Sequence, residues 1–590
     1  MPDRTDASRP ADNRVFELSI VMAGAVSGGA YQGGAMDFLI QAVDAWTRAK
    51  AEPDGAPDED RVPVPDHDVV LRGFAGTSAG SYTAAIATVA LRYDFPPVVD
   101  PQAEPGANPS EKSENPFFEA WVNRVDIDSL LQHRDFKTAS RLPGRQVLSL
   151  LDCTAIDATV DDLLDMRAPD KRRAWVADPL AVRLTLGNLR GVPYGFALGH
   201  GSAITHEMTL HADNYDFAVQ GRGAWPASLN AGYTPLLANN DRIRWGALGQ
   251  SAKASAAFPF ALRPRLVERP ASDYRGREFL DPGDGLTFPK RAIAIPPLPT
   301  MPPDYAFMCM DGGIMNNEPL ELGRTLLLTH LTDSNPRDGV NATRAVVMID
   351  PFVDPADISH ATEEVPLPAL VMPLLNAWKA QCRFKPEDLA MAGQQDIFSR
   401  FIIAPKRSLP PRPPGRPEGE PPNPLASDGL GAFLGFFDRA FRVHDFQLGR
   451  RNTQQFLRRE LAVPCDNVVV RSWWNRLTPQ QQAKAKDLGW AFDGRDGVTY
   501  VPLVPLMPGV RDEIPECPWP EAPDPKSFHD PLGDRLDRVV GGLLVEFGSS
   551  FLMRLAIKGL WRFVYRSDVL DRIVDTLDKA FAAQWFARKP

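Results

Sequence analysis

The hydrophobic and polar positions near the start of the chain form a strand pattern, a glycine-rich segment and a helical pattern, in that order. Residues 15–23 are a short apolar run typical of a strand, and residues 24–34 read GAVSGGAYQGG. A helical pattern follows over residues 35–49. Strand, glycine loop and helix in this order are typical of α/β proteins.

A second unit of the same kind follows. Residues 52–66 are rich in proline and acidic residues and are interpreted as a surface loop. A strand pattern covers residues 68–75, the pentapeptide GTSAG covers residues 76–80, and a helical pattern covers residues 81–90. The pentapeptide therefore lies between a strand and a helix.

Later segments continue the alternation. A loop over residues 96–115 precedes a mostly helical insertion that ends near residue 165. Further strand patterns lie at residues 181–189, 216–219, 305–310 and 344–349. Strands that alternate with helices favour a largely parallel sheet covered by helices on both faces.

The pattern changes after residue 355 and becomes mainly helical. We therefore predict two regions, residues 15–355 and residues 356–590. The second region contains the run PPRPPGRPEGEPPNP at residues 410–424, whose prolines exclude a regular helix or a central strand and indicate an exposed linker or loop. We find no internal repeat.

Composition narrows the class of protein. The chain has 590 residues, 44% of them hydrophobic and 24% charged, which is ordinary for a globular protein. Its formal net charge of −10 argues against nucleic acid as a partner, because phosphate contacts require a basic surface. No apolar run approaches the length of about 18 residues needed to span a membrane, and the polar N-terminus does not resemble a secretory signal. We expect a cytoplasmic protein that contacts membranes only from the surface.

The cysteines indicate neither a metal site nor a redox pair. They are five in number, widely spaced, and without a C-x-x-C motif. They are Cys153, Cys309, Cys382, Cys465 and Cys517. We expect reduced thiols and no bound metal.

The GTSAG pentapeptide matches G-x-S-x-G, the pattern of a nucleophile elbow. In such a turn the central serine, here Ser78, is presented between a strand and a helix, and small neighbours avoid clashes. Gly76 and Gly80 meet this requirement. The N–H of Ala79 and the dipole of the following helix would stabilise a developing oxyanion. As a bare pentapeptide the motif is also compatible with a simple turn.

Two other segments supply what a serine nucleophile needs. The glycine-rich loop can direct backbone N–H groups outward, although such a loop alone is also typical of nucleotide binding or plain packing. Residues 310–319 read MDGGIMNNEP, in which Asp311 follows a strand pattern and Gly312 and Gly313 allow a tight turn. Asp311 is therefore a candidate base, and by itself Asp-Gly-Gly is equally typical of an ordinary turn.

The three segments together resemble the patatin-like phospholipase family. The order of a glycine-rich loop after the first strand, then G-x-S-x-G, then Asp-Gly-Gly is that of the family, and the resemblance covers residues 15–355. SAKASAAFPFALRP at residues 251–264 resembles the family's Ala/Ser-rich helix ending at a proline, and Asn317 and Pro319 are also similar. Residues 444–457 resemble a segment of bacterial patatin-like proteins, in which Asp445 is expected to pair with Arg450 or Arg451.

The resemblance implies a three-layer α/β/α sandwich with a mostly parallel sheet, helical insertions and a helical C-terminal extension. It further implies a dyad of Ser78 and Asp311, with no histidine, metal or other cofactor. Where relatives have three glycines this chain has Gly24, Ala25 and Val26, and where they often have Arg or Lys it has Gly28. The amides of Ala25 and Val26 are the favoured oxyanion donors, followed by those of Ser27 and Gly28. The complete candidate oxyanion set is Gly24, Ala25, Val26, Ser27, Gly28, Gly29 and Ala79.

The function implied is hydrolysis of a phospholipid or another acyl ester through an acyl-enzyme. One alternative is a Ser-His-Asp esterase of another α/β-hydrolase type. Its candidate histidines are His200, His206, His211, His360, His444 and His529. A second alternative is a lipid-binding or scaffold protein with the same fold and little or no catalysis.

Residues 551–566, FLMRLAIKGLWRFVYR, are a candidate for peripheral membrane contact. Arg554, Lys558, Arg562 and Arg566 recur every four residues along an otherwise apolar helical pattern. A helix packed on the protein with a solvated basic edge has the same pattern, so both interpretations stay open. No feature of the sequence indicates an oligomeric state.

Overall fold

The computed structural model describes most of the chain, in ranges separated by gaps. The described residues are 14–52, 61–105, 112–139, 147–164, 171–197, 205–220, 232–237, 242–275, 277–280, 292–294, 297, 300–327, 336–352, 377, 382, 398–412, 422–546 and 551–589. Within the predicted proline-rich loop, residues 413–421 lie outside these ranges.

A nine-stranded sheet forms the centre of the described structure. Its main path runs β11-β10-β1-β2-β3-β4-β5, while β9 pairs with both β3 and β6. The strands are β1 (Val15–Met22), β2 (Asp68–Gly76), β3 (Val176–Ala197), β4 (Thr205–Gln220), β5 (Thr234–Leu237), β6 (Arg265–Pro270), β9 (Asp304–Met310), β10 (Arg344–Ile349) and β11 (Arg400–Ile403). The predicted strands at 181–189 and 216–219 lie within the much longer β3 and β4.

The sheet is largely parallel, so the predicted α/β class is confirmed. Parallel pairing joins β11 to β10, β10 to β1, β1 to β2, β2 to β3, and β4 to β5. Pairing is antiparallel where β3 meets β4 and β9, and where β6 meets β9. Burial follows this division: β10 is almost continuously buried, whereas buried and exposed residues alternate along β6, as expected when one face of an antiparallel pair meets solvent.

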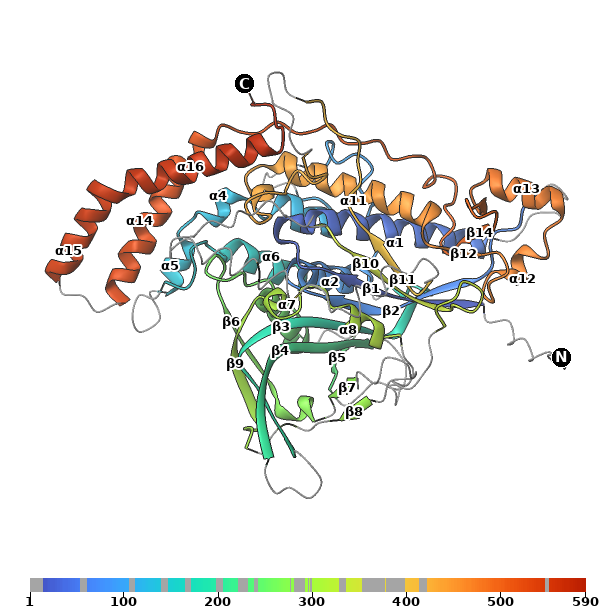
Figure 1. The fold of residues 1–590 in the computed structure, drawn as a ribbon, viewed down its shortest axis with the longest axis horizontal. Coiled ribbons are helices and arrows are strands. Elements are labelled where there is room, and N and C mark those ends of the chain that lie inside the picture. Colours follow the sequence, from blue (N-terminus) through green and yellow to red (C-terminus); the bar gives the residue numbers. More distant parts are fainter. Residues whose placement is uncertain are drawn as a thin grey trace, which may run out of the picture.

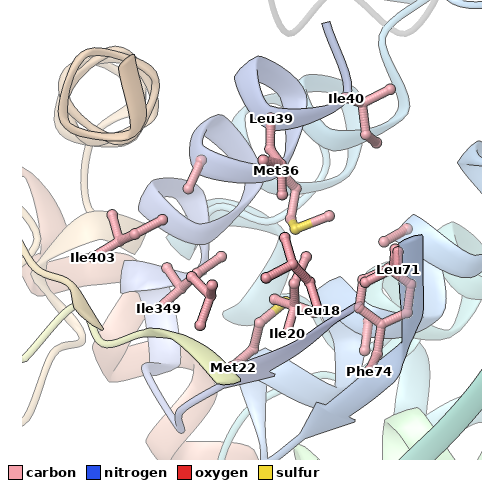
Figure 2. Close-up of a cluster of buried hydrophobic side chains, with 14 of the residues drawn as sticks. Leu18, Ile20, Met22, Met36, Leu39, Ile40, Leu71, Phe74, Ile349 and Ile403 are labelled. Atoms are coloured by element: carbon pink, nitrogen blue, oxygen red, sulfur yellow. The ribbon is translucent and has the colours of Figure 1, made fainter. Parts of the chain in front are cut away.

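Helices cover both faces of the parallel part of the sheet. On one face α1 (Gly29–Ala51) packs against apolar side chains of four strands. Figure 2 shows side chains of α1 facing those of β1, β2, β10 and β11; they are Leu18, Ile20, Met22, Met36, Leu39, Ile40, Leu71, Phe74, Ile349 and Ile403. On the other face Leu320, Leu322 and Leu327, in and just after α8 (Leu320–Thr325), pack against a smaller apolar cluster with Val21 and Met348.

The remaining helices and short strands surround this core. The helices are α2 (Ala79–Ala90), α3 (Pro116–Phe118), the π-helix η2 (Glu119–Asn123), α4 (Ile127–Leu130), α5 (Arg134–Ala139), α6 (Thr154–Leu164), α7 (Arg242–Ser255), α11 (Arg439–Arg459), α12 (Arg471–Trp474), α13 (Pro479–Asp487), α14 (His529–Glu546), α15 (Phe551–Leu560), the π-helix η8 (Trp561–Tyr565) and α16 (Arg566–Ala583). The short strands are β7 (Glu278–Leu280), β8 (Ala292–Ala294), β12 (Ala462–Pro464), β13 (Phe492–Asp493) and β14 (Thr499–Pro502). The predicted helix 35–49 therefore begins earlier, at Gly29.

The central sheet crosses the division that the sequence predicts at residue 355. β11 lies beyond that position, yet it adds a parallel strand next to β10, and Ile403 enters the core beneath α1. α11 also lies along α1, far from it in sequence (Figure 1). A four-residue strand gives too weak a pattern to be recognised within a mainly helical region.

The crossing of α1 and α11 depends on two glycines. A Cβ added to Gly34 would lie 1.9 Å from the carbonyl oxygen of Phe446, and one added to Gly449 would lie 2.1 Å from that of Tyr31. These clashes are with backbone atoms, which cannot turn aside as a flexible side chain can. Gly34 and Gly449 therefore let the two helices approach.

We expect Gly34→Ala to lower the free energy of unfolding by about 1–3 kcal/mol, because the added methyl group must push α11 away from α1. Urea unfolding followed by circular dichroism measures this change. Gly246→Ala in α7 is the matched control, because its Cβ would meet nothing within 4 Å. An unchanged midpoint for Gly34→Ala would show that α11 does not pack on α1 in solution as closely as it does here.

Two local predictions are wrong. The Ala/Ser-rich helix does not extend to the proline that was expected to end it, because α7 ends at Ser255. Asp445 does not pair with Arg450 or Arg451; it accepts hydrogen bonds from the amides of Ala426 (2.8 Å) and Ser427 (2.9 Å). Residues five and six apart on a helix point in different directions, so the arginines of α11 meet other carboxylates, Arg450 with Asp37 and Arg451 with Glu513.

Candidate active site

Ser78 lies in a sharp turn between β2 and α2. Its backbone has φ 53° and ψ −122°, a region that non-glycine residues rarely occupy, and α2 begins at the next residue. Strained backbone of this kind is found at functional sites, where neighbouring structure holds it in place. The geometry is that of the predicted nucleophile elbow, with Ser78 at the N-terminal, positive end of the α2 dipole.

Gly76 and Gly80 make this turn sterically feasible. A Cβ on Gly76 would lie 2.6 Å from the carbonyl oxygen of Gly80, and a Cβ on Gly80 would lie 2.1 Å from that of Met22. Both positions of the motif are therefore occupied by the one residue type that avoids a clash with the backbone. The elbow is also tied to β1 by a 3.1 Å hydrogen bond from the amide of Thr77 to the carbonyl of Met22.

The hydroxyl of Ser78 donates a hydrogen bond to the carboxylate of Asp311. The Oγ to Oδ2 distance is 2.7 Å, although the residues are 233 positions apart. Both side chains are nearly excluded from solvent, with 6% of Ser78 and 3% of Asp311 exposed. The structure thus brings together the two residues that the sequence singles out as nucleophile and base.

The Asp-Gly-Gly turn orients the carboxylate. Oδ1 of Asp311 accepts a 2.7 Å hydrogen bond from the amide of Gly313, which leaves Oδ2 directed at Ser78. A Cβ on Gly312 would lie 2.2 Å from the hydroxyl oxygen of Thr185. Thr185 shares a 2.8 Å hydrogen bond with Thr77, the residue before the nucleophile. Glycine is therefore required where the turn lies against β3 and the elbow.

The glycine-rich loop closely approaches Ser78. A Cβ on Gly24 would lie 3.3 Å from the Cβ of Ser78 and 2.3 Å from the amide oxygen of Asn317, which follows the Asp-Gly-Gly turn. The amide of Gly24 also donates a 3.2 Å hydrogen bond to the carbonyl of Asn317. The three predicted segments therefore meet at one place.

Hydrogen bonding within the loop separates the candidate oxyanion donors into two groups. The amides of Gly24, Ser27, Gly28 and Gly29 already donate to protein carbonyls. For the amides of Ala25, Val26 and Ala79, no acceptor is found in the part of the chain that the structure describes. Val26 also has a positive φ of 45°, unusual for a β-branched residue.

The C-terminal region holds the loop in place. The hydroxyl of Ser27 donates to the carbonyl of Ala432 and accepts a 3.1 Å hydrogen bond from the amide of Gly435, and the amide of Ser27 donates to the same carbonyl at 3.2 Å. Residues 429–432 all have positive φ, which places this carbonyl against Ser27. Ser27 therefore anchors the loop, a role that the sequence did not reveal.

Packing explains the other glycines of the loop. A Cβ on Gly28 would lie 2.7 Å from the ring of Phe352, and one on Gly29 would lie 2.1 Å from the ring of Trp121. Aromatic rings therefore lie directly against the loop at Gly28 and Gly29. Gly28 and Gly29 permit this close packing, and their amides are already hydrogen-bonded.

Ser255 is a further residue of the site that sequence reasoning did not assign. Its hydroxyl accepts a 2.9 Å hydrogen bond from the amide of Ser78 and shares a 2.8 Å hydrogen bond with Ser81, and it is fully buried at the end of α7. The amide of Asp311 donates to the carbonyl of Ala257, just beyond this helix, at 3.0 Å. The segment thus positions both members of the dyad, and its small residues were the only signal in the sequence.

The described candidate histidines make their hydrogen bonds elsewhere. Nδ1 of His211 bonds to the carbonyl of Asn188, Nδ1 of His444 bonds to the carboxylate of Asp445, and His529 pairs with Asp530. His206 lies on the surface in β4. His200 and His360 lie outside the described residues.

The site also holds a buried thiol. Burial, with the charges of Asp213 and Asp311, raises the pKa of the Cys309 thiol well above its usual value, so this thiol is a neutral neighbour of the Asp311 carboxylate.

Throughout the described ranges, no three histidine, cysteine or acidic side chains cluster in a way that could hold a metal ion. No described helix is both long enough and apolar enough to cross a bilayer.

Comparison with known proteins identifies a relative whose function is not known. The chain is 35% identical over 544 residues to the uncharacterized protein y4iI of Sinorhizobium fredii (strain NBRC 101917 / NGR234), an alignment that covers 88% of this chain and 73% of the relative. No protein-family model matches the chain. The chain belongs to the same family as y4iI.

Proposed function

We propose that this member of the y4iI family is a serine hydrolase that cleaves acyl esters, with Ser78 as nucleophile and Asp311 as general base. The observation that carries the proposal is the 2.7 Å hydrogen bond from the hydroxyl of Ser78 to Oδ2 of Asp311. A serine hydroxyl becomes a strong nucleophile only when a base takes its proton in the attack. Asp311 is the group within hydrogen-bond reach of that proton.

In the first step Oγ of Ser78 attacks the ester carbonyl carbon while its proton passes to Oδ2 of Asp311. The carbonyl oxygen becomes an oxyanion, which the unengaged amides of Ala25, Val26 and Ala79 are suited to bind. The ester C–O bond then breaks, and the leaving alcohol takes the proton from Asp311. The product is an acyl group bonded to Oγ of Ser78.

In the second step a water molecule attacks the acyl-enzyme. Asp311 accepts the proton of the water, the oxyanion forms again against the same amides, and the bond to Oγ breaks as Ser78 regains its proton. The fatty acid leaves and the dyad returns to its starting state. The orientation of the carboxylate by Gly313 supports both steps, because one oxygen stays directed at Ser78.

The order of the motifs supports a patatin-like assignment with phospholipids as the substrate class. The loop follows β1, the elbow follows β2, and Asp-Gly-Gly follows β9, with helices on both sheet faces as in a three-layer α/β/α sandwich. Other acyl esters are the next candidate substrates. The patatin-like assignment is more specific than the α/β class, and it is based on the resemblance of the three sequence motifs to that family.

Labelling with a fluorophosphonate tests the proposal, because such probes bond covalently to an activated serine. We expect wild-type protein to be labelled, with the modification located at Ser78 by mass spectrometry. A panel of phospholipids, lysophospholipids and short acyl esters would then define the substrate. Well-folded protein that is not labelled would instead favour a lipid-binding or scaffold protein with the same fold.

The anchoring of the oxyanion loop by the C-terminal region leads to a separate prediction. A Cβ on Gly435 would lie 2.5 Å from Oγ of Ser27, so Gly435→Ala must displace Ser27 and with it the loop. We expect kcat/KM for a short acyl ester to fall by about 10²-fold, because a displacement of about 1 Å near a reacting group has an effect of this magnitude.

Thermal unfolding is the control for this variant, since a general loss of structure would also lower activity. Gly559→Ala, in α15, where the added Cβ would meet nothing within 4 Å, is a comparison for adding a methyl group in the C-terminal region. Full activity of folded Gly435→Ala would show that the position of Ser27 does not matter for catalysis.

A further inference from the structure

The segment formed by α15 and η8 exposes large apolar side chains. Met553 is 57% exposed, Ile557 37%, Leu560 49% and Tyr565 52%. Figure 1 shows α14, α15 and α16 extending away from the rest of the molecule, with α15 at the far end. Single exposed apolar residues are common on proteins, but a contiguous group indicates an interaction surface.

Three exposed apolar side chains of α15 lie on one face. Met553, Ile557 and Leu560 are separated by four and three residues, the spacing that aligns side chains along a helix. A different face of the segment contacts α14: the indole N–H of Trp561 donates to Asp537 at 2.7 Å, and Arg566 pairs with Asp537 at 3.1 Å. The exposed side chains of Met553, Ile557 and Leu560 therefore lie on a different face from these contacts with α14.

The charge of the segment differs in sign from that of the whole chain. Residues 551–566 contain four basic and no acidic residues, whereas the chain has a net charge of −10. Lys558 and Arg562 are exposed, and Lys558 lies about 130° around the helix axis from the mean direction of Met553, Ile557 and Leu560. Lys558 is therefore on the polar side of α15, near Gly541 of α14, and does not interrupt the apolar face.

We propose that α15 and η8 bind the surface of a bilayer that contains anionic lipids. Met553, Ile557 and Leu560 enter the boundary between headgroups and acyl chains, while Lys558 and Arg562, on the polar side, add positive charge close to the lipid phosphates. Tyr565 has an apolar ring and a polar hydroxyl, a combination favoured at this depth. At about 1.5 Å per residue the segment is roughly 24 Å long, and its basic polar side suits a helix lying in the interface.

This binding needs neither Ser78 nor Asp311, so the inference goes beyond the proposed hydrolase activity and does not depend on it. If both hold, the arm, as α15 and η8 are called from here on, would bring the enzyme to the surface where its substrate lies. If the dyad proves inactive, vesicle binding by the arm remains expected.

Vesicle sedimentation with the full-length chain tests the proposal. The chain carries Ser78→Ala in every sample, so that hydrolysis cannot alter the lipid. The vesicles are phosphatidylcholine alone or phosphatidylcholine mixed with phosphatidylglycerol. We expect binding to the mixed vesicles and at least about tenfold weaker binding to phosphatidylcholine alone, because each basic residue near an anionic surface adds to the attraction.

Two independent variants separate the apolar from the electrostatic contribution. Met553→Ser/Ile557→Ser/Leu560→Ser is expected to weaken binding to both kinds of vesicle by about tenfold or more, whereas Lys558→Glu/Arg562→Glu is expected to act mainly on the anionic ones. The matched controls are Val99→Ser/Leu409→Ser for exposed apolar residues and Lys484→Glu/Arg495→Glu for exposed basic ones. Both control pairs should bind like the parent.

The proposal is overturned if the parent does not bind mixed vesicles, or if both arm variants bind as tightly as it does. Sedimentation velocity without lipid gives a further check. Should the arm variants change the oligomeric state of the chain and leave vesicle binding intact, the exposed face is an interface between copies of the chain, and the membrane assignment is wrong. Circular dichroism of each variant establishes that it is folded.

Discussion

Ser78→Ala is expected to lower kcat/KM for acyl esters by about 10⁴-fold or more and to abolish labelling by a fluorophosphonate. The variant removes the oxygen that forms the acyl bond, so no covalent path remains, and losses of this size or larger follow removal of a catalytic nucleophile in other serine hydrolases. Steady-state hydrolysis of a short ester and mass spectrometry of the labelled protein measure the two effects.

Serine and alanine are close in size, and the hydroxyl of Ser78 donates its proton to the buried carboxylate of Asp311. We therefore expect the free energy of unfolding to fall by about 1–3 kcal/mol, because this carboxylate loses a hydrogen bond, and the protein to stay folded. Ser272→Ala, at an exposed serine in the 3-10 helix after β6, is the matched control and should keep wild-type activity. Hydrolysis by Ser78→Ala at the wild-type rate would end the hydrolase proposal for this site.

Asp311→Asn is expected to lower kcat/KM by about 10²–10⁴-fold, the usual range for loss of a general base. An asparagine side chain has nearly the same shape as the carboxylate and can still accept a hydrogen bond from Ser78, but it cannot take the proton. The variant therefore tests the chemistry of the carboxylate separately from its place in the structure. The labelling rate of Ser78 should fall in parallel.

Two controls accompany this variant. Asp304→Asn changes an exposed carboxylate on the same strand, β9, and should leave activity unchanged. His211→Gln and His444→Gln remove described histidines that bond to other groups, and they too should leave labelling of Ser78 intact. Loss of labelling in a histidine variant, with Asp311→Asn still active, would instead support a Ser-His-Asp triad.

The sequence pattern predicted correctly those structural features whose physical cause lies within a short segment of the chain. The alternation of strands and helices, the largely parallel sheet and the turn around Ser78 follow from short-range hydrophobic periodicity and from Gly76, whose missing Cβ avoids the backbone of Gly80 in the same turn. The boundaries of elements were less well predicted. The start of α1 at Gly29 and the end of α7 at Ser255 depend on packing against Trp121 and on contacts of the elbow, which no local pattern encodes.

The glycine-rich loop shows most clearly which residue roles could not be predicted from the sequence. Every residue there has an amide, so the sequence favoured Ala25 and Val26 without excluding Ser27 and Gly28. In the structure the amides of the latter two already donate, to the carbonyls of Ala432 and Ala25. The decisive partner of Ser27 is more than 400 residues away, in a loop with four consecutive positive φ angles.

The sequence by itself determined the α/β class, the elbow with Ser78, the candidate carboxylate Asp311 and the basic, apolar segment 551–566, since each rests on residues close together in the chain. Only the tertiary structure decided that Asp311 meets Ser78, that Ser255 and Ser27 hold the nucleophile and the loop, that β11 completes the sheet, and that apolar side chains on one face of α15 are exposed. The physical reason is distance along the chain. Hydrogen bonds and close packing between segments hundreds of residues apart depend on how the whole core assembles, and periodicity within one segment carries no information about its distant partner.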